Sequence, residues 1–114
     1  MEKPKIRHIA INSKDAEKVV AYYKKVFGME EKFRDARGGV FLSDGYIALT
    51  VFSTTRCPYG INHFGFQVPS IEAIEKISEG TAKVEPPEPG IVADCWLPDI
   101  EGNRVDLSEE GWPT

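Results

Sequence analysis

The sequence has few cysteines and no long apolar run, and these shortages argue against several classes of protein. Its two cysteines, Cys57 and Cys95, lie far apart and form no Cys-x-x-Cys motif, unlike a zinc ribbon or a disulfide-rich secreted domain. One disulfide is arithmetically possible, but we expect reduced thiols that serve as small apolar groups. Apolar stretches are short and interrupted by charge, and Met1–Arg7 lacks the apolar core of a signal peptide. We therefore expect a soluble, cytoplasmic protein with no membrane partner.

Clusters of positive charge are also missing. Lys and Arg together number 14 and Asp and Glu number 18, which gives a formal net charge of −4. An acidic chain without a basic cluster has no electrostatic footprint for a phosphate backbone, so no nucleic-acid partner is expected. Hydrophobic residues make up 41% of the 114 residues, which is enough to bury a core. We expect one domain over residues 1–114.

The expected order of elements is strand, helix, strand, strand, strand, and it occurs twice. In the first half the elements are a strand at Lys5–Asn12, a helix capped by Ser13 and ended by Gly28, and strands near Met29–Arg34, Val40–Leu42 and Tyr46–Phe52. In the second half they are a strand at Ile61–Val68, a helix from the cap Ser70 to Gly80, and strands near Ala82–Glu85, Val92–Leu97 and Arg104–Ser108.

Two segments of the chain repeat without a gap. Ile6-Arg7-His8-Ile9-Ala10-Ile11-Asn12 aligns with Ile61-Asn62-His63-Phe64-Gly65-Phe66-Gln67. The repeat predicts two tandem βαβββ modules, with module one at about 4–53, a connector at 54–60 and module two at about 61–110. We expect an α+β fold in which the modules form a curved eight-stranded cup with the helices on its outer face.

Alternation along the predicted strands separates an apolar face from a polar one. His8, His63 and Asp106 all fall on the polar face, where the small residues Ala10 and Gly65 leave space. Such a roomy, sparsely polar surface is typical of a ligand pocket. The candidate pocket residues are Tyr46, Ala48, Thr50, Gln67 and Arg104. Trp112, near the end of the chain, is expected to pack on the body of the protein or on a partner chain.

These segments resemble the vicinal oxygen chelate superfamily, which includes glyoxalase I, methylmalonyl-CoA epimerase, extradiol dioxygenases, and fosfomycin- and bleomycin-resistance proteins. The resemblance spans nearly the whole chain. It is carried by the segments Ile6–Ile11, Tyr22–Met29, Asn62–Phe66 and Asp99–Leu107. It implies the fold more strongly than the reaction, because this fold hosts many chemistries and some proteins that are not enzymes.

The resemblance implies a divalent metal held by the first, fourth, fifth and eighth strands. The matching positions here are His8, Ala48, His63 and Asp106, so Ala48 stands where glyoxalase I has Glu. What remains is the two-His, one-carboxylate set of extradiol dioxygenases, which suits Fe²⁺ with open coordination positions. Mn²⁺, Zn²⁺, Ni²⁺ and Co²⁺ are the other candidates. Asp106 could instead simply pair with Arg104 or another cation.

Two functions of different classes follow from the resemblance. The first is a divalent-metal-dependent enzyme that acts on a small molecule chelating through two adjacent oxygens, with dioxygenase-like or glyoxalase-like lyase/isomerase chemistry. No general base can be named, because Ala48 removes the obvious carboxylate. The second is a metal-free protein that sequesters a small aromatic or antibiotic molecule, as the bleomycin-resistance relatives do. Relatives of this length usually dimerise, so a homodimer is expected.

Overall fold

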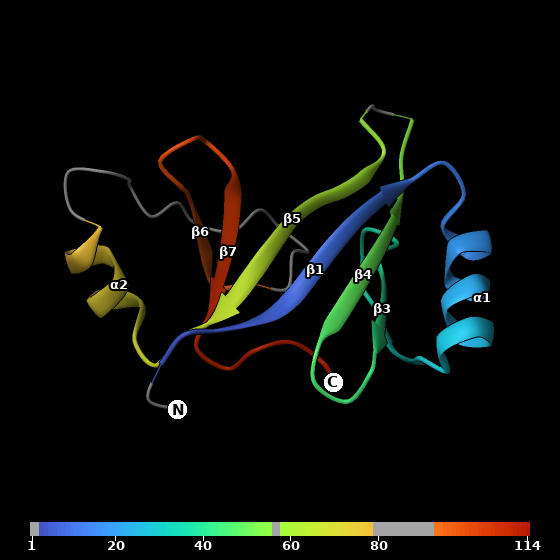
Figure 1. Cartoon of the computed structure of the whole chain (residues 1–114), viewed down its shortest axis with the longest axis horizontal. Helices are drawn as coiled ribbons and strands as arrows, with labels where there is room; N and C mark the ends of the chain where they lie inside the picture. The colour runs from blue at the N-terminus through green and yellow to red at the C-terminus, as the bar shows by residue number, and fades with distance from the viewer. Residues whose placement is uncertain (1–2, 56–57, 79–92) are drawn as a thin grey trace.

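The computed structural model describes residues 3–55, 58–78 and 93–114, and within them seven strands form one mixed sheet flanked by two helices (Figure 1). The elements are β1 (Lys5–Ser13), α1 (Ala16–Phe27), β2 (Glu30–Arg34), β3 (Val40–Ser43), β4 (Ala48–Ser53), β5 (Gly60–Gln67), α2 (Ile71–Ile77), β6 (Cys95–Pro98) and β7 (Arg104–Ser108). The strand order across the sheet is β2-β3-β4-β1-β5-β7-β6. The predicted α+β class is confirmed.

The sheet is built outward from a central antiparallel pair, β1 and β5. On one side β4 runs parallel to β1, and on the other side β7 runs parallel to β5. Antiparallel strands then follow on each side, β3 and β2 beyond β4 and β6 beyond β7. The expected strand at Ala82–Glu85 lies outside the described residues. The eight-stranded cup and its division into modules 4–53 and 61–110 therefore stay predictions.

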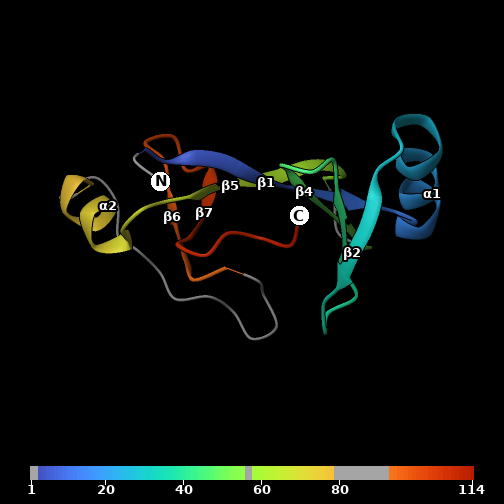
Figure 2. The same ribbon diagram turned by 90° about the horizontal axis from the view of Figure 1, so that it is seen from below.

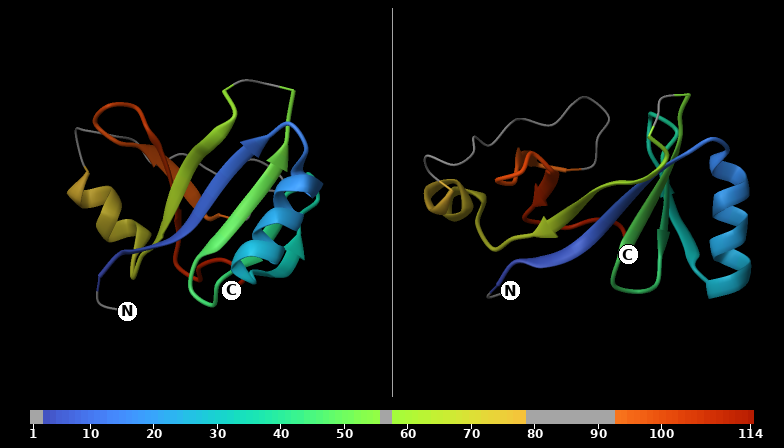
Figure 3. Two further views of the ribbon diagram at one scale, coloured as in Figure 1. Left: turned by 45° about the vertical axis from the view of Figure 1, so that its right-hand side comes forward. Right: turned by 45° about the horizontal axis from the view of Figure 1, so that its top comes forward.

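Helix α1 covers the apolar face of the first half of the sheet (Figure 3). Its buried residues Ala16 and Val20 pack against Val40, Leu42 and Val51. The alternation expected for β4 is therefore realised, with one side of the strand turned to the helix. Because α1 covers the apolar face of β1 and β4, the polar face of these strands lies on the opposite side of the sheet.

The start of α1 differs from the prediction. Asp15, not Ser13, is the N-cap, and its carboxylate accepts a hydrogen bond from the Lys18 backbone N–H at 3.3 Å. Ser13 is the last residue of β1, where its hydroxyl donates to the Phe52 carbonyl at 2.8 Å. Both serine and aspartate are good N-caps. Because strand pairing holds Ser13 in β1, the helix begins two residues later and Asp15 caps it.

The second helix forms as expected at its start but is shorter. Ser70 caps α2 by accepting from the Ala73 backbone N–H at 3.1 Å, and the helix ends at Ile77, before Gly80. An apolar groove of about 340 Å³ lies between α2 and the second half of the sheet. Its lining includes Phe66, Val68, Ile74, Leu97, Val105 and Leu107. The groove lies on the apolar face of β5 and β7 and is not the pocket predicted on the polar face.

The two ends of the sheet bend toward the same side, and the C-terminal segment runs along that side (Figure 2). Cys95 is buried against Val68 and Leu107, where burial raises the pKa of its thiol to about 11, so it serves as the small apolar group expected of it. Cys57 lies outside the described residues. Neither helix in the described part of the chain is long and apolar enough to cross a membrane.

Candidate metal centre

The register of three neighbouring strands brings His8, His63 and Asp106 together. His8 on β1 lies opposite Gly65 on β5, and Gly65 in turn lies opposite Asp106 on β7. All three side chains reach the polar face, and one potential ligand atom from each lies within 4.8 Å of the others. The three residues that the sequence placed on one face therefore lie side by side.

The spacing of these atoms fits one divalent ion. His63 Nε2 lies 3.1 Å from Asp106 Oδ2. Ligands at about 2.0–2.2 Å from one ion are about 3 Å apart in adjacent positions and about 4.4 Å apart in opposite ones. The His63 and Asp106 atoms thus already have the separation of two adjacent ligands. Two imidazoles with one carboxylate suit Fe²⁺, Mn²⁺, Co²⁺ or Zn²⁺.

His8 is prepared to act as a neutral ligand. It is 3% exposed, and burial together with the charge of His63 lowers the pKa of its imidazole to about 4. Its Nδ1 lies 3.3 Å from the Ala48 carbonyl oxygen and 3.4 Å from the Thr50 hydroxyl. When Nδ1–H donates to that carbonyl, Nε2 keeps its lone pair, which is the tautomer that a metal requires.

Asp106 provides a buried negative charge. It is 1% exposed, and its Oδ1 accepts from Arg104 Nε at 2.9 Å while Oδ2 faces His63. Burial raises the pKa of the Asp106 carboxyl, but its contacts first with His63 and then with Arg104 bring the pKa below its usual value. Asp106 is therefore ionised at neutral pH. The pairing with Arg104, which the sequence left open as an alternative to metal binding, is present and leaves Oδ2 turned toward His63.

His63 is oriented by its neighbour in the chain. Its Nδ1 lies 2.6 Å from Asn62 Oδ1, and its Nε2 faces Asp106. A metal-ligating histidine commonly has its second nitrogen held by a side chain or carbonyl in this way. No periodicity or motif in the sequence indicates this role for Asn62.

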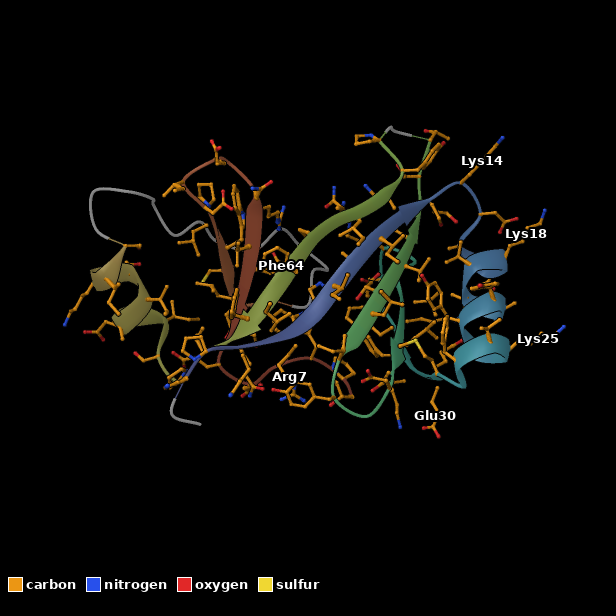
Figure 4. The ribbon with its side chains drawn as sticks, viewed as in Figure 1. Arg7, Lys14, Lys18, Lys25, Glu30 and Phe64 are labelled. Carbon is orange, nitrogen blue, oxygen red and sulfur yellow. The ribbon has the colours of Figure 1, made fainter. Side chains whose placement is uncertain are left out.

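The five candidate pocket residues divide into two groups. Ala48 and Thr50 lie against His8, and Arg104 lies against Asp106. Tyr46 and Gln67 instead contact Arg7, whose guanidinium lies 4.1 Å above the Tyr46 ring and donates to Gln67 Oε1 at 2.8 Å. Figure 4 shows Arg7 beside the C-terminal segment.

Aromatic rings next to His8 were not foreseen. The Trp112 indole is stacked on the His8 ring with centroids 4.8 Å apart, and Phe41 is nearly parallel to His8 at 6.2 Å. The expectation that Trp112 packs on the body of the protein is confirmed, since it is 6% exposed. The sequence feature that permits this packing is Gly65. The Trp112 ring occupies the space that a side chain would need there, since a Cβ on residue 65 would lie only 2.7 Å from Trp112 Cη2.

A family model described as Glyoxalase/Bleomycin resistance protein/Dioxygenase superfamily matches residues 5–84. No curated protein matches the chain in sequence. The match ends before β6 and β7, so Asp106 lies beyond it.

Several solved structures share the fold at low sequence identity. A methylmalonyl-CoA epimerase variant from Streptomyces coelicolor, in complex with 2-nitronate-propionyl-CoA, is 21% identical with a TM-score of 0.69, over 93% of this chain and 96% of that one. A hypothetical protein from Bacillus halodurans is 21% identical with a TM-score of 0.65, over 91% and 92%. The 2,3-dioxygenase LapB from Pseudomonas sp. KL28 is 18% identical with a TM-score of 0.72, over 99% of this chain but 43% of that one.

Proposed function

Since the chain belongs to the glyoxalase/bleomycin resistance protein/dioxygenase superfamily, we propose that it is a divalent-metal-dependent enzyme in which His8, His63 and Asp106 hold the ion. Its substrate is a small molecule that chelates through two adjacent oxygens. One observation carries the proposal: ligand atoms of three residues far apart in sequence lie within 4.8 Å of one another. Fe²⁺ is the favoured ion, because two histidines and one carboxylate leave positions open.

The residues around the centre have distinct roles in this proposal. When bound, the ion supplies a Lewis acid that polarises the oxygens of the substrate. His8 contributes a neutral ring at physiological pH, and Asp106 contributes the negative charge that offsets part of the charge of the ion. Arg104 holds the Asp106 carboxylate through Oδ1 and so directs Oδ2 toward His63.

The surroundings of His8 favour oxygen-dependent or Lewis-acid chemistry over isomerisation. Isomerisation by proton transfer needs a general base beside the substrate. Ala48, fully buried at the position where glyoxalase I has Glu, offers only a methyl group, and the neighbouring Thr50 offers a hydroxyl. Protein loaded anaerobically with Fe²⁺ and mixed with catechol is expected to consume dioxygen once air is admitted. Loss of catechol without dioxygen consumption would contradict the dioxygenase-like assignment.

A second candidate is a metal-free protein that binds a small aromatic molecule. Its support is that Asp106 has two partners within the protein itself, His63 and Arg104, and that His8 is flanked by the rings of Trp112 and Phe41. Aromatic walls with a few polar groups are common in such binding sites.

Metal analysis distinguishes the two candidates. Protein purified without chelators is expected to carry one divalent ion per chain, and His63→Ala and Asp106→Asn are expected to lose it. Asp15→Asn is the matched control, because it removes the same charge at the α1 N-cap, where Asn caps equally well. An absence of metal from every variant, even after incubation with Fe²⁺, Zn²⁺ or Co²⁺, would favour the metal-free binder.

A further inference from the structure

Trp112 buries a hydrogen-bond donor that has no acceptor. Among the described residues, two buried side-chain polar atoms lack a partner: Trp112 Nε1 and Asp35 Oδ2, the latter in the turn between β2 and β3. Buried polar atoms without partners are rare in folded proteins, and each requires an explanation. An indole N–H can only donate, so the missing partner must be an atom with a lone pair.

The position of the ring places this donor beside the candidate metal centre. Trp112 stacks on His8, and its Cζ2 and Cη2 atoms pack on Gly65. Gly65 lies between His8 and Asp106 in the cross-strand register. Nε1 and Cζ2 are bonded to the same ring carbon, so the N–H lies on the edge of the indole that meets Gly65.

The segment that carries Trp112 is fixed on both sides of it. Before Trp112, the Gly111 backbone N–H donates to Ser108 Oγ at 2.9 Å, and Gln67 Nε2 donates to the Glu109 carbonyl at 3.1 Å. After it, Ser43 Oγ donates to the Thr114 carbonyl at 3.1 Å. Figure 2 shows the segment running along the side toward which both ends of the sheet bend. These hydrogen bonds on both sides of Trp112 hold its indole in place.

We propose that Trp112 is a ligand-positioning residue whose indole N–H donates a hydrogen bond to an oxygen of the small molecule bound at the His8, His63 and Asp106 centre. The inference rests on the proposed function for the location of that molecule. The indole N–H can donate a hydrogen bond but cannot accept one. It therefore binds an anionic oxygen of the ligand better than a hydroxyl group, whose own proton would need a different acceptor. The matching class of ligand is therefore a bidentate oxygen anion, such as a catecholate.

The test uses the full chain loaded with Zn²⁺, which is diamagnetic, and 4-nitrocatechol as the probe. Trp112→Phe keeps an aromatic ring on His8 and removes the N–H. We expect Zn²⁺ affinity to change by less than about twofold and the Kd for 4-nitrocatechol to rise about tenfold, as is typical for a lost hydrogen bond to a charged group. Equal 4-nitrocatechol affinity in both proteins would overturn the proposal.

Nuclear magnetic resonance of the wild-type protein gives a readout that does not depend on the variant folding well. The sequence has two tryptophans, so the indole N–H signals number two and Trp112→Phe or Trp96→Phe assigns them. Addition of 4-nitrocatechol to the Zn²⁺ form is expected to move the Trp112 indole proton downfield more than the Trp96 proton. An unmoved Trp112 signal under saturation would contradict the proposal.

The same titration separates this inference from the proposed function. If neither Zn²⁺ nor Fe²⁺ nor Co²⁺ binds, the metal-enzyme proposal fails, and 4-nitrocatechol is added to the metal-free protein. A downfield shift of the Trp112 indole proton there would retain the donor role in a metal-free binding site. No shift in either form would overturn the donor role as well.

Discussion

The indole of Trp112 and the imidazole of His8 are stacked with their planes 13° apart. The two residues come from opposite ends of the chain, so the last segment completes the surroundings of the first strand. Together with Phe41, Trp112 gives the most buried histidine of the centre an apolar environment. That environment is the main physical cause of the low pKa of His8, since it penalises the charged ring, and the charge of His63 adds to it.

The metal-free protein is expected to lose stability as the pH falls from about 6.5 to about 4. In the unfolded chain His8 binds a proton near pH 6.5, but in the folded protein its pKa is about 4. The unfolded state therefore binds more protons in this interval, and the free energy of unfolding decreases by up to about 3 kcal/mol. Urea unfolding at several pH values, followed by circular dichroism, measures this slope.

His8→Phe is the matching variant, because it keeps an aromatic ring next to Trp112 and removes the titrating group. Its stability is expected to depend less on pH over the same interval. A slope equal to that of the wild type would show that the acid sensitivity arises at another residue.

Gly65→Ala is expected to displace the Trp112 ring. A Cβ at this position would lie 2.7 Å and 2.9 Å from Trp112 Cη2 and Cζ2, and 3.2 Å from the Asp106 carbonyl oxygen. Overpacking of this kind typically costs about 1–3 kcal/mol of unfolding free energy. Chemical unfolding measures the cost, and the tryptophan fluorescence maximum is expected to move to longer wavelength as the indole becomes exposed.

A double-mutant cycle isolates the contact between these residues. In a Trp112→Leu background the two clashing ring atoms are absent, so Gly65→Ala is expected to cost less than it does in the wild type. An equal cost in both backgrounds would assign the effect to the Asp106 carbonyl instead.

The sequence predicted the parts of the site that depend on strand periodicity. Alternation placed His8, His63 and Asp106 on one face, and the register of β1, β5 and β7 then brought them together. Each of these residues belongs to a regular strand, where the direction of a side chain follows from its position. For the same reason, Ala48 and Thr50 could be assigned to the surroundings of His8.

The contacts of irregular segments were not predictable in the same way. Tyr46 precedes β4, so strand alternation does not apply to it, and its ring packs under Arg7 with 47% of the residue exposed. The stacking of Trp112 on His8 depends on the path of the segment after β7, which no periodic pattern encodes. The shift of the α1 cap from Ser13 to Asp15 likewise reflects tertiary pairing and not local preference.

Arg7→Met is expected to loosen the C-terminal segment without unfolding the sheet. Arg7 donates to the Tyr46 carbonyl at 2.7 Å, to Gln67 Oε1 at 2.8 Å and to Thr114 Oγ1 at 3.4 Å. Loss of these bonds is expected to lower stability by about 1 kcal/mol and to speed hydrogen exchange of the amides from Glu109 to Thr114.

Lys14→Met is the control for Arg7→Met, because Lys14 is exposed and points away from the body of the protein (Figure 4). It removes one positive charge in the same way but is expected to leave exchange in the C-terminal segment unchanged. Equal acceleration in both variants would mean that net charge, and not the Arg7 contacts, holds the segment.

Binding of a divalent ion near pH 6 is expected to release no more than one proton per chain. A ligand must lose its proton before it can coordinate, so metal binding normally displaces protons from histidines. His8 is already neutral above about pH 4, and the contacts of Asp106 with His63 and Arg104 keep its carboxyl ionised. Two of the three ligands therefore have no proton to release. Calorimetric titration with Zn²⁺ in buffers of different ionisation enthalpy counts the protons, and a release of two would show that His8 is protonated in the metal-free protein.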